Sequence, residues 1–445
     1  MEFTRKKIIT IGLVVGGVIV LLLIISALWP KKTVKPAYLV VWGVYDEEDV
    51  FKEQIIEYTK QNKGIVVKYE KKNPVTYEED LIRAFAENKA PDIWMMHNTW
   101  LPKYKSLIKE FPQTLSKEIL PFETFRNSFV EVVEKDFSEN NKIYGLPLYV
   151  DTLAMYYNKD FFNSEGIINP PQTWDELVED MDSLGKKDQW GQITRAGVAM
   201  GTAENINRAT DILNLLMLQN GTKMISDDKG KTTFNESVRI DEKTYYPGRE
   251  ALRFYTDFSN PSKRTYTWNR QMPYSVDAFI EGKTAIMFNY SHQIPIIRAR
   301  ASYLNFGIAL MPQVKDRNFD INYANYWGFT VAKKDKSLEN ERIAQEAWKL
   351  VVFLTQQGNS KNYLVKTKKP TARKDLVDWQ KNDLDLGVFA KQSLTAKSWY
   401  QADNLKIEKI FINAIDSVIL GSATVEKAID VAASQVNLEI GGTKQ

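Results

Sequence analysis

Short apolar runs alternate with amphipathic segments along the chain after residue 37. Tyr38 to Trp42 is an apolar run that predicts a buried strand. In residues 46–62 apolar side chains recur at helical spacing after four acidic residues, which favours a helix beginning there. Residues 65–69, 77–88 and 91–96 continue the order as strand, helix and strand. This order predicts an α/β fold built on a parallel sheet with right-handed crossovers.

A second unit of the same kind begins after residue 162. Thr173 is followed three residues later by Glu176, which is the pattern of a capping box and predicts the start of a helix. Residues 208–219 predict another helix, whereas residues 221–248 are rich in turn formers and charges and predict a surface excursion. A chain of 445 residues exceeds one ordinary domain, so we expect two lobes.

The N-terminal segment carries the longest apolar run. Ile8 to Leu28 contains no charged residue, and at ~1.5 Å per residue it can span the ~30 Å hydrocarbon core of a bilayer. The following Trp29 suits the headgroup layer, and no small-x-small cleavage pattern is evident. We therefore predict an uncleaved transmembrane anchor with a cytoplasmic stub in residues 1–30, then a linker over residues 31–37. A cleaved signal peptide is the alternative.

Composition narrows the function classes. Lys and Arg number 59 against 56 Asp and Glu, and this near balance excludes the electrostatic footprint of a nucleic-acid-binding protein. The chain has no Cys, which excludes disulfides, thiol catalysis, thiolate metal sites and a lipid-modified N-terminal Cys. Aromatic residues make up 12% of the chain, and aromatic rings with polar tips suit half-hydrated binding surfaces.

The sequence contains no complete catalytic motif of the following kinds: a helical metal-binding pair, a nucleophile elbow and a phosphate-binding loop. The two histidines, His97 and His292, offer no helical metal-binding pair, and no G-x-S-x-G elbow is present. Gly282-Lys283-Thr284 lacks the preceding glycine of a phosphate-binding loop. We expect a binding protein rather than an enzyme, without cofactor or metal. Paired carboxylates for glycoside hydrolysis leave an anchored glycan-processing enzyme open as an alternative.

One segment carries a specific resemblance. Tyr144 to Phe162 contains Gly-Leu-Pro, then Asp151-Thr, then Tyr-Tyr-Asn-Lys-Asp-x-Phe. This pattern resembles the first interlobe crossing of the maltose-binding-protein-like family, the bacterial extracellular solute-binding proteins of ABC importers. Further segments that resemble the family, in the expected order, are 279–290, 326–331, 347–355 and 370–373.

The resemblance implies a type II periplasmic-binding-protein-like fold, with two α/β lobes joined by three crossings. The first lobe would comprise residues 38–149 and 331–369, and the second 150–330 and 370–440. The body would lie outside the cytoplasm, tethered by residues 8–28. It would act as a monomer that closes around a solute and docks on ABC permease subunits. A two-lobed sensor or assembly protein without a transport role is the alternative.

The cleft between the lobes should hold the ligand, because open α/β sheets bind ligands at the carboxyl ends of their strands. Aromatic rings suit the C–H faces of a sugar, and polar side chains suit its hydroxyl groups, so we expect a carbohydrate, in particular an oligosaccharide. Peptides or other polar solutes could use the same surface. The candidate ligand-binding residues are Trp42, Tyr45, His97, Asn98, Trp100, Asp151, Tyr290, Ser291, Tyr326, Trp327, Arg373, Trp399 and Tyr400.

Overall fold

The computed structural model describes residues 17, 36–240 and 242–442. The predicted anchor, Ile8 to Leu28, lies outside the described residues except for Gly17, and so does most of the predicted linker. Within the described ranges, no helix combines the length and the apolar character that crossing a membrane requires.

The first lobe is built on a five-stranded sheet in the order β2-β1-β3-β16-β6. Strand β1 pairs in parallel with β2 and β3, which confirms the parallel sheet predicted from the hydrophobic pattern. The fourth strand, β16, comes from far along the chain and runs antiparallel to β3 and β6. The strands are β1 (Ala37–Gly43), β2 (Ile65–Lys71), β3 (Ile93–His97), β6 (Leu146–Pro147) and β16 (Trp327–Val331), with the short hairpin β4 (Ser138–Glu139) and β5 (Lys142–Ile143) beside them.

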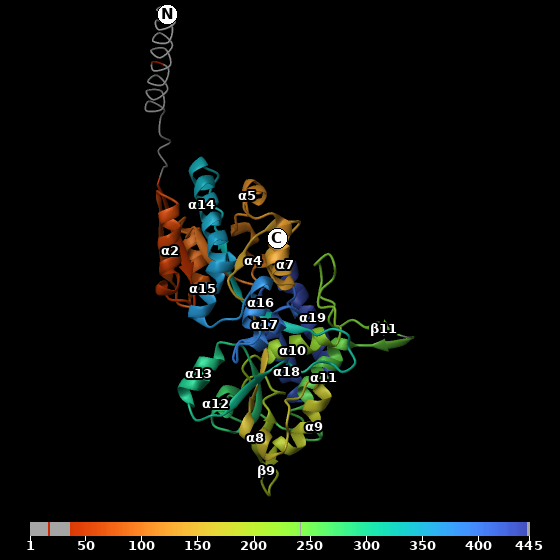
Figure 1. Cartoon of the computed structure of the whole chain (residues 1–445). Coiled ribbons are helices and arrows are strands. Elements are labelled where there is room, and N and C mark those ends of the chain that lie inside the picture. The colour runs from red at the N-terminus through yellow and green to blue at the C-terminus, as the bar shows by residue number, and fades with distance from the viewer. Residues whose placement is uncertain (1–16, 18–35, 241, 443–445) are drawn as a thin grey trace, which may run out of the picture.

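Helices pack against this sheet through aromatic side chains. Phe51, on the inner face of α2, stacks on Tyr363 of α15 with ring centroids 5.6 Å apart. Trp348 of α14 is fully buried, and its Nε1 donates to the Lys109 carbonyl at 3.0 Å. Figure 1 shows α2, α14 and α15 side by side. The helices of this lobe are α2 (Glu48–Gln61), α3 (Tyr77–Ala86), α4 (Leu101–Tyr104), η1 (Lys105–Leu107), α5 (Gln113–Glu118), α6 (Phe122–Ser128), α7 (Glu131–Phe137), α14 (Leu338–Thr355) and α15 (Gln357–Thr367).

The second lobe is built on a mixed sheet in the order β14-β8-β13-β10-β9. Its strands are β8 (Ala154–Asn158), β9 (Lys186–Lys187), β10 (Ile193–Val198), β13 (Thr284–Asn289) and β14 (Phe306–Ala309). The predicted surface excursion, residues 221–248, contains the antiparallel hairpin of β11 (Val238–Ile240) and β12 (Lys243–Tyr245), which projects from the body in Figure 1.

The capping box predicted at Thr173 is confirmed. Its hydroxyl accepts from the backbone N–H of Glu176 at 3.2 Å, and the Glu176 carboxylate accepts from the Thr173 N–H at 3.3 Å. The helices of this lobe are α8 (Lys159–Ser164), α9 (Trp174–Leu184), α10 (Ala209–Gln219), α11 (Pro247–Asp257), α12 (Ser275–Ile280), α13 (Gln293–Arg300), α16 (Val377–Gln380), α17 (Gly387–Ser393), α18 (Asn404–Ile419) and α19 (Val425–Gly442). The short helix η2 (Lys374–Leu376) packs with the first core through Leu376.

The buried apolar residues form two separate cores, one for each sheet. The chain passes from the first core to the second after Val150, back before Ala324, and across again after Leu376, with Ala396 packing once more in the first core. A small sheet of β7 (Asp151–Thr152), β15 (Asn322–Asn325) and β17 (Ala396–Lys397) lies at these passages. Tyr323 packs in the second core and Ala324 in the first, because β16, which follows them, pairs with β3 in a long-range contact that local sequence does not reveal.

Candidate binding cleft

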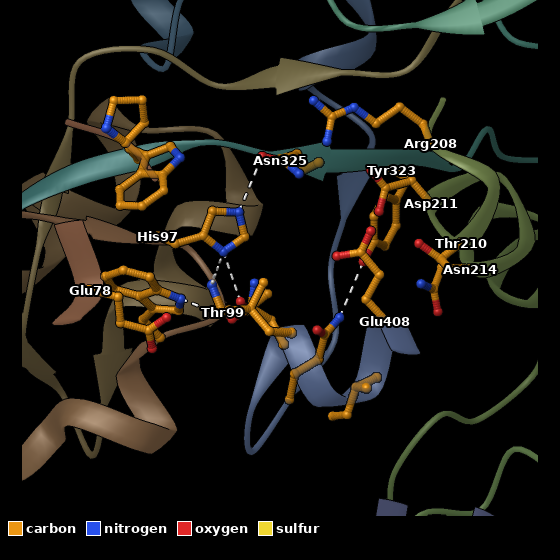
Figure 2. A pocket seen from close by; sticks show the side chains of 18 of the residues that line it. Glu78, His97, Thr99, Arg208, Thr210, Asp211, Asn214, Tyr323, Asn325 and Glu408 are labelled. Atoms are coloured by element: carbon orange, nitrogen blue, oxygen red, sulfur yellow. Dashed lines mark hydrogen bonds between the residues drawn. The ribbon is translucent and has the colours of Figure 1, made fainter. Parts of the chain in front are cut away.

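A cavity of about 360 Å³ lies between the two cores, where the passages meet the carboxyl end of β3. Its two walls have different chemistry, as Figure 2 shows. One wall carries indole and imidazole rings and belongs to the first lobe; the other carries charged and amide groups from the second lobe and from β15. The lining residues used below are Tyr45, Tyr77, Glu78, His97, Thr99, Trp100, Arg208, Asp211, Asn214, Tyr323, Asn325, Trp327, Gln401, Asn404 and Glu408.

The aromatic wall is centred on Trp327. Its ring centroid lies 4.9 Å from that of Trp100 and 5.6 Å from that of Tyr45, both at edge-on angles. Trp100 in turn stacks on Tyr77 at an interplanar angle of 10°. Trp327 opens β16 directly opposite His97, the last residue of β3, so the sheet register itself assembles this wall. Such a wall offers apolar ring surface to a ligand.

His97 is fixed by two hydrogen bonds. Its Nε2 donates to Asn325 Oδ1 at 3.1 Å, and its Nδ1 accepts from the Thr99 hydroxyl at 2.8 Å. Burial lowers the pKa of His97 to about 4, with the Arg208 charge adding to the effect. The imidazole is therefore neutral near pH 7, and both of its nitrogens are hydrogen-bonded within the protein.

This burial of a neutral histidine predicts a specific acid sensitivity. The unfolded chain binds a proton at His97 below about pH 6.5, whereas the folded chain does so only near pH 4. The free energy of unfolding should therefore fall as the pH drops through this interval, by about 2–3 kcal/mol from this residue. Urea titrations from pH 7 to pH 4 should show a shallower loss for His97→Gln than for the wild type. Equal slopes for the two proteins would contradict the prediction.

The polar wall comes mainly from α10 and α18. Arg208 precedes α10 with φ of 69°, a left-handed conformation that is strained for a residue other than glycine. Its guanidinium lies over the Tyr290 ring at 5.2 Å, and the Tyr290 hydroxyl donates to Asp211 Oδ2 at 2.8 Å. Burial raises the pKa of Asp211, and burial followed by repulsion from Asp211 raises the pKa of Glu408. Both hydrogen-bond donors and acceptors therefore face the cavity.

A smaller cavity of about 180 Å³ continues from the main one, sharing Tyr45, Arg208, Asn325 and Trp327. Asp151 lies at its wall with its carboxylate already occupied. It accepts from the Ser291 hydroxyl at 2.6 Å and from the backbone N–H groups of Ser291 and Thr152 at 3.0 and 2.9 Å. Burial raises the pKa of Asp151 to about 7, although these donors oppose the shift. Asp151 therefore ties the first passage to the end of β13.

A third cavity, of about 550 Å³, lies on the other side of Thr99 and Gln401, which line both it and the main cavity. Tyr400 and Lys229 line it, with the ammonium 5.4 Å from the ring centroid. Asp136, also in its lining, accepts from Tyr326, Asn98 and Ser398; the first two hydrogen bonds measure 2.8 and 2.9 Å. Burial raises the pKa of Asp136 to about 6.

Two contacts link the lobes beside the main cavity. Trp100 Nε1 donates to Asn404 Oδ1 of α18 at 2.9 Å. Lys103 lies 2.7 Å from Glu78 in its own lobe and 2.8 Å from Asp403 in the other. These contacts hold the two walls at their present separation.

The comparisons with known proteins agree with this architecture. A family model described as bacterial extracellular solute-binding protein matches residues 53–386. The chain belongs to this family. The resemblance stated from the sequence motifs is thereby confirmed, and so is the expectation of a binding protein rather than an enzyme.

Individual relatives of this solute-binding protein are distant. The galactooligosaccharide-binding protein of Bacillus subtilis is 22% identical over 419 residues, covering 92% of this chain and 91% of the relative. The cyclic alpha-maltosyl-1,6-maltose binding protein from Arthrobacter globiformis superposes with a TM-score of 0.75 at 17% identity, over 92% and 100% of the two chains. The sugar-binding protein MalE from Xanthomonas citri superposes with a TM-score of 0.73 at 19% identity, over 92% of this chain and 98% of MalE. These structural likenesses establish the two-lobed fold.

The structure brings most of the predicted site residues of this solute-binding protein to the three cavities. Tyr45, His97, Trp100 and Trp327 line the main cavity. The other predicted residues in the linings are Asp151, Tyr290 and Ser291 at the smaller cavity, and Asn98, Trp399 and Tyr400 at the largest.

Three predicted residues line none of these three cavities. Trp42 is buried beneath Lys72, whose ammonium lies 3.9 Å from its ring. Tyr326 is fully buried, and its hydroxyl donates to Asp136. Arg373 donates to the Thr355 carbonyl at 2.9 Å and pairs with Asp375. Strand alternation explains why the Tyr326 side chain points into the core, because successive side chains point to opposite faces and the neighbouring Trp327 faces the cleft.

The sequence interpretation missed much of the polar wall. Arg208 and Asp211 could have been identified from the sequence, because they are charged residues within or beside the otherwise apolar helix α10. Glu408 carried none, because it lies among lysines on an amphipathic helix and resembles a solvent-exposed position. Among the described residues, no cluster of three or more His, Asp or Glu side chains could hold a metal ion.

Proposed function

We propose that this chain is the membrane-anchored solute-binding component of an ABC importer, and that it binds a carbohydrate, an oligosaccharide, in the cleft between its lobes. The observation that carries the proposal is the main cavity, where an aromatic wall faces a wall of hydroxyl, amide and charged groups. Sugar rings have apolar C–H faces and polar edges, and the two walls match these two surfaces. The names of the relatives, which include galactooligosaccharide and maltose-type ligands, support the same class of solute.

The same arrangement supports delivery by hinge closure. The contacts from Trp100 to Asn404 and from Lys103 to Asp403 join the two lobes beside the cavity. A ligand that touches both walls binds the closed form better and shifts the population toward it. The closed form would then dock, as a monomer outside the cytoplasm, on permease subunits, with residues 8–28 as the tether.

A thermal-shift screen of the full chain in mild detergent tests the proposal. Neutral oligosaccharides of two to six units should raise the melting temperature, with a stabilisation of about 2.7 kcal/mol at a hundredfold excess over Kd. Peptides and monosaccharides of matched concentration serve as controls, and product analysis after incubation tests for turnover. Stabilisation by peptides alone, or hydrolysis of the saccharide, would contradict the proposal.

A further inference from the structure

The main cavity carries a surplus of negative charge. Three carboxylates, those of Glu78, Asp211 and Glu408, line it against the single guanidinium of Arg208. His97 adds no charge, because burial lowers its pKa to about 4. The whole chain has a formal net charge of +3, so this negative character is local to the cleft.

The carboxylates on the second-lobe wall are not neutralised by direct contact. Among the described residues, Arg208 forms no ion pair with either Asp211 or Glu408, and Glu408, which is exposed to solvent at the cavity wall, has no hydrogen-bond or ion-pair partner in the protein. Asp211 accepts from the Tyr290 hydroxyl and from the Asn325 amide, which are both neutral donors. Each carboxylate raises the free-energy cost of the charge on the other, and a cation placed between them would relieve that repulsion.

Negative charge also exceeds positive charge around Glu78. Lys103 is the ammonium that pairs with Glu78, but it also pairs with Asp403, so two carboxylates share one positive charge. Arg208 lies over the Tyr290 ring and lines both the main and the smaller cavity. Burial raises the pKa of Asp211 and of Glu408, and the charge of Arg208 opposes the shift at both, so one guanidinium serves two carboxylates. The positive groups therefore offset only part of the negative charge around the cavity.

The aromatic wall complements a cation as well. Trp100 and Trp327 line the same cavity as the three carboxylates, and indole rings attract ammonium groups through their negative π faces. A neutral solute would use these rings only for apolar contact. An amine would use both the rings and the carboxylates.

We propose that the solute is an amino saccharide, whose protonated amine is held by Glu408 and Asp211 opposite the aromatic wall. This inference rests on the proposed function and narrows its solute class. Glu408 is the specificity-determining residue, because it is the carboxylate without a partner in the described chain. Asp211, in the first turn of α10, provides the second carboxylate that contacts the amine.

Calorimetry on the full chain with three trisaccharides of equal length tests the proposal. The probes are the β-1,4-linked glucosamine trimer, its N-acetylated form, and cellotriose, which has a hydroxyl in place of each amine. The glucosamine trimer should bind about tenfold or more tightly than cellotriose, because charge-assisted hydrogen bonds exceed neutral ones by that order. Its affinity should also fall with added salt more steeply than that of cellotriose.

The variant Glu408→Gln should abolish the preference for the glucosamine trimer over cellotriose. Glu179→Gln is the matched control, because Glu179 is an exposed glutamate on α9 outside the cleft. Equal affinities for the amine and cellotriose would overturn the inference and leave the proposed function standing. A preference that survives both Glu408→Gln and Asp211→Asn would also overturn it. If no saccharide binds, both proposals fail.

Discussion

Replacing Asp151 by alanine is expected to lower the free energy of unfolding by about 3 kcal/mol. The Asp151 side chain is only 5% exposed and accepts hydrogen bonds from Ser291 and Thr152. Without the carboxylate, two buried backbone N–H groups lose their acceptor, and each unsatisfied buried donor costs about 1–3 kcal/mol. Because Asp151 lies where the chain first passes between the cores, the loss should also loosen the coupling of the two lobes.

Urea denaturation of a graded series checks this prediction. Ser291→Ala removes one donor and leaves the carboxylate, so it should cost about 1 kcal/mol, and Asp151→Asn should fall between the two variants. A different result would favour the role expected from the sequence: if Asp151→Ala keeps full stability and loses ligand affinity, the carboxylate binds the solute rather than the chain.

Replacing Trp327 by alanine is expected to weaken saccharide binding by about 10- to 100-fold. Trp327 is the ring to which Tyr45, Tyr77, His97 and Trp100 all pack, with centroid separations from 4.9 to 6.0 Å. Removing it deletes a stacking surface, and aromatic stacking is worth about 1–3 kcal/mol when measured by alanine substitution. Neighbouring rings would also lose their fixed orientation.

Calorimetric titration with the tightest saccharide of the thermal-shift screen measures the loss. Trp327→Phe should retain part of the affinity, which separates loss of the ring from loss of the fold. Trp190→Ala is the matched control, because Trp190 lies in the turn between β9 and β10, is 77% exposed and lines none of the three cavities. Affinity unchanged in Trp327→Ala and reduced in Trp190→Ala would place the binding surface elsewhere.

The local elements of the fold could be predicted because local physics determines them. The apolar run Tyr38 to Trp42 became β1, and the acidic start with helical periodicity after residue 46 became α2. The Thr173 capping box formed as predicted, since its two hydrogen bonds join residues only three apart. The position of β16 could not be predicted in this way, because its pairing with β3 joins residues more than two hundred positions apart.

The binding cleft, too, could be predicted from the sequence only in part. Motif order indicated the family, and aromatic residues at strand ends indicated Tyr45, His97, Trp100 and Trp327 as lining residues of the cavity. The polarity of a residue alone could not tell whether its side chain meets a ligand or another part of the chain.

The sequence by itself determined that this is a two-lobed α/β solute-binding protein, because hydrophobic periodicity, caps and motif order are local properties. Only the tertiary structure decided which charges face the cleft. Asp151 points to Ser291, 140 residues further along the chain, whereas Glu408 on an ordinary amphipathic helix faces the cavity without a partner among the described residues. Side-chain partners are fixed by long-range packing, and the binding chemistry depends on the groups that packing leaves unpaired.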